Sequence, residues 1–184
     1  PNWPDCAQLD PMSRWASRDA DNAAPRVLLA ERARARGDLP GLREQVAFAA
    51  SLRRFDSYRP RGGAVVWTVL QGVASVAREP ETPFAATAIG AARANVATAE
   101  AAAVCRHDGP AATPEHGDAC RHLARSMADR ADTWEAREVG LAILWSWTGD
   151  AAERSRLAAE RDALEASSLS CNRARLALVE ALNR

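Results

Sequence analysis

The residues best suited to chemistry lie in one segment, between positions 105 and 122. This segment holds every histidine of the chain, His107, His116 and His122, together with two of its four cysteines, Cys105 and Cys120. Cysteine sulfurs and histidine nitrogens are preferred zinc ligands, so a site formed by Cys105, Cys120, His107 and His116 is one interpretation. His116 and Cys120 are four positions apart, which would bring them to one face of a helix, whereas Cys120 and His122 would diverge.

The same cysteines also suit a disulfide, which is the interpretation we favour. A Cys105–Cys120 bond would tie the end of one expected helix to the start of the next, and its short loop would contribute about 3 kcal/mol. The remaining pair, Cys6 and Cys171, would then fasten the N-terminal segment to the C-terminal helices. Four cysteines form an even set, and the chain begins at Pro1 without Met, as it would after removal of a signal peptide. We therefore expect a periplasmic or secreted protein of a Gram-negative bacterium.

A short motif in this segment offers an enzymatic alternative. Residues 105–109, Cys-Arg-His-Asp-Gly, resemble the His-Asp motif of small secreted prokaryotic phospholipases A2, which are helical and disulfide-linked. The resemblance implies that His107 orients an attacking water and that Asp108 binds calcium. That family carries the motif within a helix, whereas a Gly-Pro pair follows closely here. The alternative function is thus a small secreted hydrolase, or a zinc-binding protein, centred on His107, His116 and His122.

Composition excludes several other classes of protein. The 24 basic residues are balanced by 24 acidic ones, so there is no excess positive charge to hold a nucleic acid. The chain contains no lysine, which excludes a lysine Schiff base and a P-loop lysine. No Gly-x-Gly-x-x-Gly, His-Glu-x-x-His, Gly-x-Ser-x-Gly or EF-hand motif is present. No apolar run reaches the roughly 18 residues of a membrane span. We expect no cofactor, no nucleic-acid partner and no enzymatic activity.

Helices must position these residues, because alanine and arginine are abundant and no stretch alternates as a strand does. We expect an irregular lead over residues 1–20, with a short helical turn near 12–17, followed by a single all-α domain over 21–184. Its seven or eight helices would form stacked antiparallel pairs. The expected helices cover residues 25–36, 38–57, 64–78, 83–105, a stretch from 113, and then 132–148, 150–166 and 170–183.

Local signals mark the ends of several of these helices. Gly37 suits the left-handed conformation that ends a helix, and Asp38 suits the cap of the next one. Thr113 followed by Pro114 is a start signal. Asp132 with Glu135, and Asp150 with Glu153, have the spacing of capping boxes. A heptad of apolar residues would permit one helix over 150–183, but we favour a turn at the serine-rich residues 167–170.

One stretch resembles a known repeat family. Asn22, Leu29, Ala30, the Gly37-Asp38 turn and Ala49 follow the order of small and apolar positions in a tetratricopeptide repeat over residues 21–54. Arg26 stands where that repeat usually has an aromatic residue. The resemblance implies an architecture of stacked helical pairs and a role in binding partners.

The six tryptophans suggest where a partner would bind. Interfaces favour tryptophan and arginine, and Trp145 and Trp147 cannot share one face of a helix. We therefore predict a partner-binding patch containing Trp134, Trp145, Trp147 and Arg137. The predicted function is an exported, non-enzymatic module that presents a helical surface to a protein partner, as an antagonist or immunity-type protein would. The sequence leaves the oligomeric state open.

Overall fold

The computed structural model describes residues 10–57 and 96–182, and within these ranges the secondary structure is helical apart from one isolated bridge. The expected all-α fold is confirmed. The predicted helix at 64–78, most of the one at 83–105 and the side chains of Cys6 and Cys171 lie outside the described residues. The helices are α1 (Pro11–Arg18), α2 (Ala23–Ala35), α3 (Leu39–Ala50), an unlabelled segment at 96–104, α6 (Pro114–Arg130), α7 (Trp134–Trp147) and α8 (Ala151–Leu182).

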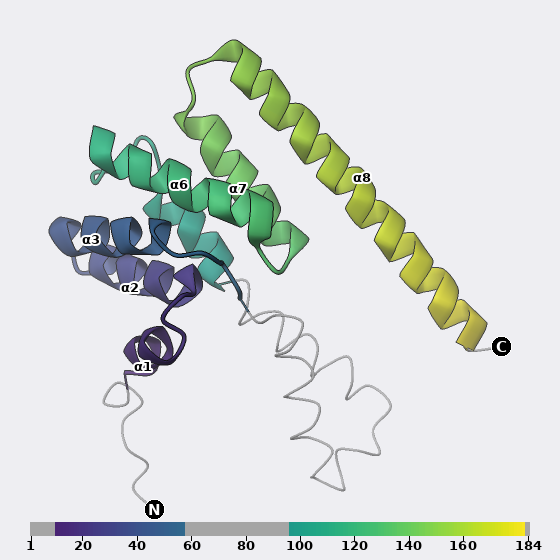
Figure 1. The fold of residues 1–184 in the computed structure, drawn as a ribbon, viewed down its shortest axis with the longest axis horizontal. Helices are drawn as coiled ribbons and strands as arrows, with labels where there is room; N and C mark the ends of the chain where they lie inside the picture. Colours follow the sequence, from purple (N-terminus) through teal and green to yellow (C-terminus); the bar gives the residue numbers. More distant parts are fainter. Residues whose placement is uncertain (1–9, 58–95, 183–184) are drawn as a thin grey trace, which may run out of the picture.

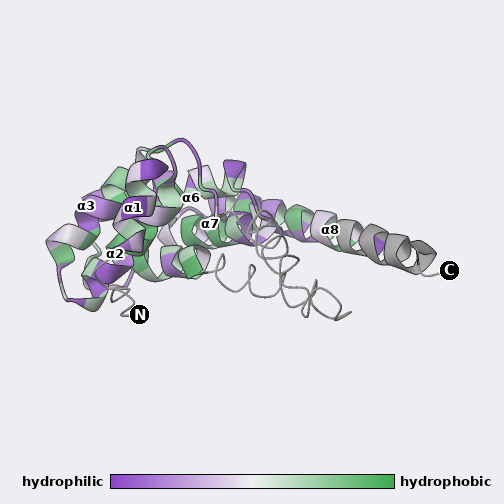
Figure 2. Ribbon diagram, turned by 90° about the horizontal axis from the view of Figure 1, so that it is seen from below, coloured by the Kyte–Doolittle hydropathy of each residue, from purple (hydrophilic) through white to green (hydrophobic). Residues whose placement is uncertain are grey.

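The helices pack in the order in which they follow one another along the chain. α1 contacts α2, α2 pairs with α3, α3 contacts α6, α6 pairs with α7, and α7 contacts α8. Three-residue connections at 36–38, 131–133 and 148–150 make successive helices antiparallel (Figure 1). α8 is much longer than the others, and Figure 2 shows from a second direction that it leads away from the packed helices.

Short polar side chains begin these helices, and the sequence predicted this role for Asp38, Thr113 and Asp150. Each accepts a hydrogen bond from a backbone N–H of the first turn, which would otherwise lack a partner. Gly37, with a φ of 72°, ends α2 in the left-handed conformation. α7 differs from the prediction, because its cap is Thr133 and not Asp132. The capping residues are Asp10, Asn22, Asp38, Thr113, Thr133 and Asp150.

α3 ends earlier than predicted, at Ala50 and not near residue 57. The chain then turns back toward the start of α2, where the side chain of Asn22 accepts a hydrogen bond from the amide of Asp56 at 2.9 Å. The backbone carbonyl of Arg54 accepts a bond from Ala23 at 2.9 Å. Phe55 is fully buried although it lies outside the helix. Burial of Phe55 therefore does not require the helix to continue beyond Ala50.

The predicted break at residues 167–170 is wrong, because α8 is continuous from Ala151 to Leu182. Serine costs only about 0.5 kcal/mol relative to alanine in a helix, and strong helix formers flank the three serines. Ser167 and Ser170 are exposed, so nothing in the packing forces a turn there.

The buried core extends from α2 and α3 through segment 96–104 to α6 and α7. The sequence predicted that His116 and Cys120 share one face of a helix, and this face of α6 is buried together with Leu123 and Met127. α7 approaches α6 closely at Gly140, where an added Cβ would lie 2.6 Å from the carbonyl oxygen of Ala124. Among the described residues, no helix is both long enough and apolar enough to cross a membrane.

Candidate partner-binding surface

Two tryptophans of α7 project from the same side of that helix. Trp134 and Trp145 are eleven residues apart, which is about three helical turns or roughly 16 Å. Their exposed fractions are 44% and 50%, large values for the most hydrophobic aromatic side chain. Tryptophan combines a large apolar area with an N–H donor, which is why it is enriched where proteins meet.

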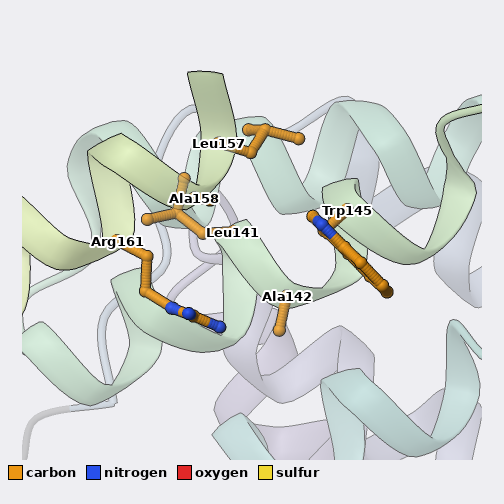
Figure 3. Close-up of a pocket in the computed structure, with 6 residues that line it drawn as sticks. All are labelled: Leu141, Ala142, Trp145, Leu157, Ala158 and Arg161. Atoms are coloured by element: carbon orange, nitrogen blue, oxygen red, sulfur yellow. The ribbon is translucent and has the colours of Figure 1, made fainter. Parts of the chain in front are cut away.

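Trp145 forms one end of a hollow between α7 and α8. Its volume is about 210 Å³, and it is lined by Leu141, Ala142, Trp145, Leu157, Ala158 and Arg161. Figure 3 shows Trp145 and Arg161 at opposite ends of this hollow, with Ala142 between them. Only the arginine brings a charge to the lining, so the hollow is an apolar site with a basic end.

A second hollow lies at the other end of α7, around Trp134. It encloses about 270 Å³, with Arg137 on α7 and Leu164 and Ser168 on α8 among its lining residues. Both hollows follow the junction of the same two helices. We call the residues that line them, together with Arg154, the α7–α8 groove.

The arginines of the α7–α8 groove are bonded mainly to backbone oxygens. Arg137 donates to the carbonyl oxygens of Ala131 and Asp129 at 3.3 and 3.4 Å. Arg154 donates to the carbonyl of Thr148 at 2.8 Å, and its guanidinium lies 5.1 Å from the centre of the Trp145 ring. These bonds position the two guanidinium groups, and among the described residues neither group has an ion pair with a carboxylate.

Two other charged residues of the groove, Arg161 and Asp132, each have a contact. Arg161 has a 3.7 Å contact with Asp162, its neighbour in sequence. Asp132, the acidic residue of the lining, accepts hydrogen bonds from the amide and hydroxyl of Ser57 at 3.1 and 3.2 Å. Burial and a hydrogen bond with Asp56 raise the pKa of the Asp132 carboxyl. The groove holds three arginines and one aspartate. The lining therefore carries net positive charge.

Glu153 and Glu160, near the start of α8, form ion pairs with two arginines. Arg125 of α6 lies 3.6 Å from both Glu153 and Glu160, and Arg156 also contacts both of them. These exposed pairs contribute little to stability, because water screens the attraction between the charges.

Trp147 lies on another side of α7 from Trp134 and Trp145. It is half-buried, and its indole Nε1 donates a 2.7 Å hydrogen bond to the carbonyl of Cys105. The rings of His107 and His116 each lie 6.4 Å from it, edge to face. The structure thus brings Trp134, Trp145 and Arg137 of the predicted patch together, and uses Trp147 to join α7 to the cysteine–histidine segment.

Cys105 and Cys120 form a disulfide, with an S–S distance of 2.06 Å, and both are buried. The bond joins the end of segment 96–104 to α6, so the sulfurs that the zinc interpretation requires are bonded to each other. Within the described residues, no group of three or more histidine, cysteine or carboxylate side chains is arranged to hold a metal.

His116 is packed beside this disulfide. Its Nε2 lies 2.9 Å from the carbonyl oxygen of Val104 and 3.6 Å from Sγ of Cys120, and it donates to the carbonyl. Nδ1 is buried and has no hydrogen-bond partner among the described residues. Burial lowers the pKa of the imidazole, so the neutral ring is the form that fits this position.

The other candidate catalytic residues are exposed and already paired. Asp108, the residue of the phospholipase-like motif that would bind calcium, accepts two hydrogen bonds from Arg106 at 3.0 and 2.9 Å, which lower its carboxyl pKa. His107 lies in the turn that follows segment 96–104, whereas the motif of that family lies within a helix. His122 is exposed on α6, with Nδ1 3.0 Å from the carbonyl of Asp118.

The sequence prediction missed the contribution of α8 to this surface. Leu157, Ala158 and Arg161 form half of the hollow beside Trp145. The signal was present in the seven-residue spacing of Leu157 and Leu164, both of which pack against α7 or the core. Comparison of the chain with known protein families, with curated proteins and with solved structures gave no match.

Proposed function

We propose that this chain is an exported, non-enzymatic protein-binding module, and that it receives its partner in the α7–α8 groove. The observation that carries the proposal is the pair of half-exposed tryptophans, Trp134 and Trp145, on one side of α7 and beside two hollows walled by α8. Burying an aromatic side chain of this size in a partner contributes several kcal/mol to binding.

The shape of α8 supports the same proposal. Leu157 is buried and Leu164 is half-buried, but beyond them Leu169 is 51% exposed and the helix continues to Leu182 (Figure 1). Most of the stability of a helix in a protein comes from packing of one face. The exposed side of α8 around Leu169 is therefore available to another molecule.

The buried disulfide supports export. Disulfides persist in the periplasm and outside the cell, and they are rare in reducing compartments. A compact module with an exposed recognition groove suits a periplasmic antagonist or an immunity-type protein, which acts by covering a surface of its target. We propose this as the class of partner.

Site-specific photo-crosslinking tests the proposal. Ala142 is exposed at the floor of the groove, and Ala35 is exposed at the end of α2, far along the chain of packed helices. A photoreactive phenylalanine derivative at position 142 should crosslink a discrete protein in the producing cells, whereas the same group at position 35 should not. The double variant Trp134→Ala/Trp145→Ala should lose that crosslink. A partner captured equally from both positions, or by the double variant, would contradict the proposal.

A further inference from the structure

We infer that the segment bound in the α7–α8 groove is an acidic amphipathic helix of the partner, with one large apolar side chain inserted between α7 and α8. The inference rests on the proposed function and specifies the chemistry of the partner. It depends on the volume of the hollow beside Trp145, the length of the groove and the charge of its lining.

The hollow beside Trp145 is large enough for one apolar anchor. Its walls are the aliphatic side chains of Leu141, Ala142, Leu157 and Ala158, and its volume is about 210 Å³. A dry cavity of about 150 Å³ lined by leucine, isoleucine and phenylalanine holds a benzene molecule. A leucine or phenylalanine side chain of a partner therefore fits here, and Trp145 supplies one edge of its pocket.

The length of the groove favours a helix as the bound segment. The two tryptophans are about 16 Å apart along α7, close to three turns of a helix. A helix laid in a groove presents anchors at positions i, i+3 or i+4, and i+7, all on one face. A partner helix of three to four turns would thus contact both Trp134 and Trp145, with its polar face directed outward.

The charge of the lining favours an acidic partner. Arg137 and Arg154 are held by backbone carbonyls, and Arg161 has only the contact with its neighbour Asp162 among the described residues. Glu138 is exposed on α7 but does not line either hollow. Carboxylates flanking the apolar anchor would meet arginines at both ends of the groove, and such complementarity sets specificity and speeds association.

A pair of designed peptides tests the inference. One is a fluorescein-labelled helical peptide of about 18 residues, with leucines on one face and glutamates beside them, and the other has lysine at every glutamate position. Binding to the full chain is followed by fluorescence anisotropy at about 50 mM and about 300 mM salt. The glutamate peptide should bind and should weaken as salt rises, whereas the lysine peptide should bind at least tenfold more weakly.

Variants locate the binding site within the chain. Arg161→Glu and Trp145→Ala should each weaken binding of the glutamate peptide at least tenfold. Arg173→Glu is the matched control, because Arg173 is exposed on the same helix about 18 Å beyond Arg161. It carries the same charge change and should alter binding less than twofold. Circular dichroism establishes that all variants keep the helical fold.

Several outcomes would overturn the inference. Equal binding of both peptides, no binding of either, or an equal effect of Arg173→Glu and Arg161→Glu would each do so. A dimer in sedimentation that Arg161→Glu abolishes would make a second copy of the chain the occupant. If acrylamide does not quench the fluorescence of Trp145 in the free chain, another part of the chain covers the groove, and the inference is wrong. If the peptides fail while the crosslinked partner still requires Trp134 and Trp145, this inference alone fails and the proposed function stands.

Discussion

Replacing Gly140 with alanine tests the close approach of α7 to α6, on which the orientation of the groove depends. The new methyl carbon would lie 2.6 Å from the carbonyl oxygen of Ala124 and 2.7 Å from the amide nitrogen of Ala128. Both are backbone atoms of α6, so neither can rotate away as a side chain could. The two helices must move apart, and the cost of such overpacking is about 1–3 kcal/mol.

The clash opposes a gain in helix propensity. Glycine to alanine inside an exposed helix stabilises by about 1 kcal/mol, because alanine loses less conformational entropy. Two backbone contacts well below 3 Å put the cost near the top of its range, so we expect a net loss of about 1–2 kcal/mol. For a chain of this size, that corresponds to a melting temperature roughly 2–8 °C lower.

Thermal unfolding followed by circular dichroism measures the effect, and urea unfolding with an unchanged m-value would confirm that stability alone has changed. Gly149→Ala is the matched control, because an added Cβ there meets nothing within 4 Å and its φ is not positive. Its melting temperature should equal or exceed that of the wild type. A Gly140→Ala protein as stable as the wild type would refute the packing of α6 on α7 described above.

Three further changes should alter stability in defined directions. Replacing both Cys105 and Cys120 with alanine removes a bond that closes a loop of sequence separation 15, and should lower the free energy of unfolding by about 3 kcal/mol in urea titrations. Burial lowers the pKa of His116, so as pH falls the imidazole is protonated in the unfolded chain before it is protonated in the folded one. Wild-type stability should therefore fall as pH drops below about 6.5. A His116→Gln variant should show a smaller decline between about pH 7 and pH 5. Asn22→Ala should cost about 2–3 kcal/mol by calorimetry, because its amide donates to Asp19 and to the carbonyl of Asp56 at 2.7 and 2.8 Å in a fully buried position.

Helix starts and stops could be predicted because they depend on a few neighbouring residues. Asn22, Asp38, Thr113 and Asp150 accept bonds from amides two or three residues ahead, and Gly37 adopts the one conformation that favours glycine. The burial of one face of α6 followed from helical spacing in the same way. These signals act over one turn of helix, so a single sequence contains them in full.

Features that depend on distant residues could not be predicted. α3 ends at Ala50 because the following strand-like segment bonds to Asn22, and the guanidinium of Arg54 is held by Asp19, Asp21 and Asp56. No local pattern connects residue 54 to residue 19. The groove also depends on residues from another helix, because the hollow beside Trp145 forms only when Leu157 and Arg161 of α8 pack next to it.

The indole N–H signals of the chain test the central claim most directly, that Trp134 and Trp145 form the partner-binding surface. Both side chains are half-exposed, whereas the Nε1 of Trp147 is hydrogen-bonded to the carbonyl of Cys105 inside the fold. The chain is labelled with ¹⁵N, and single Trp→Phe substitutions assign each indole signal. The partner identified by crosslinking is then purified and added in excess. The account predicts that the signals of Trp134 and Trp145 shift or broaden while that of Trp147 stays in place. Unchanged Trp134 and Trp145 signals in a saturated complex would contradict it.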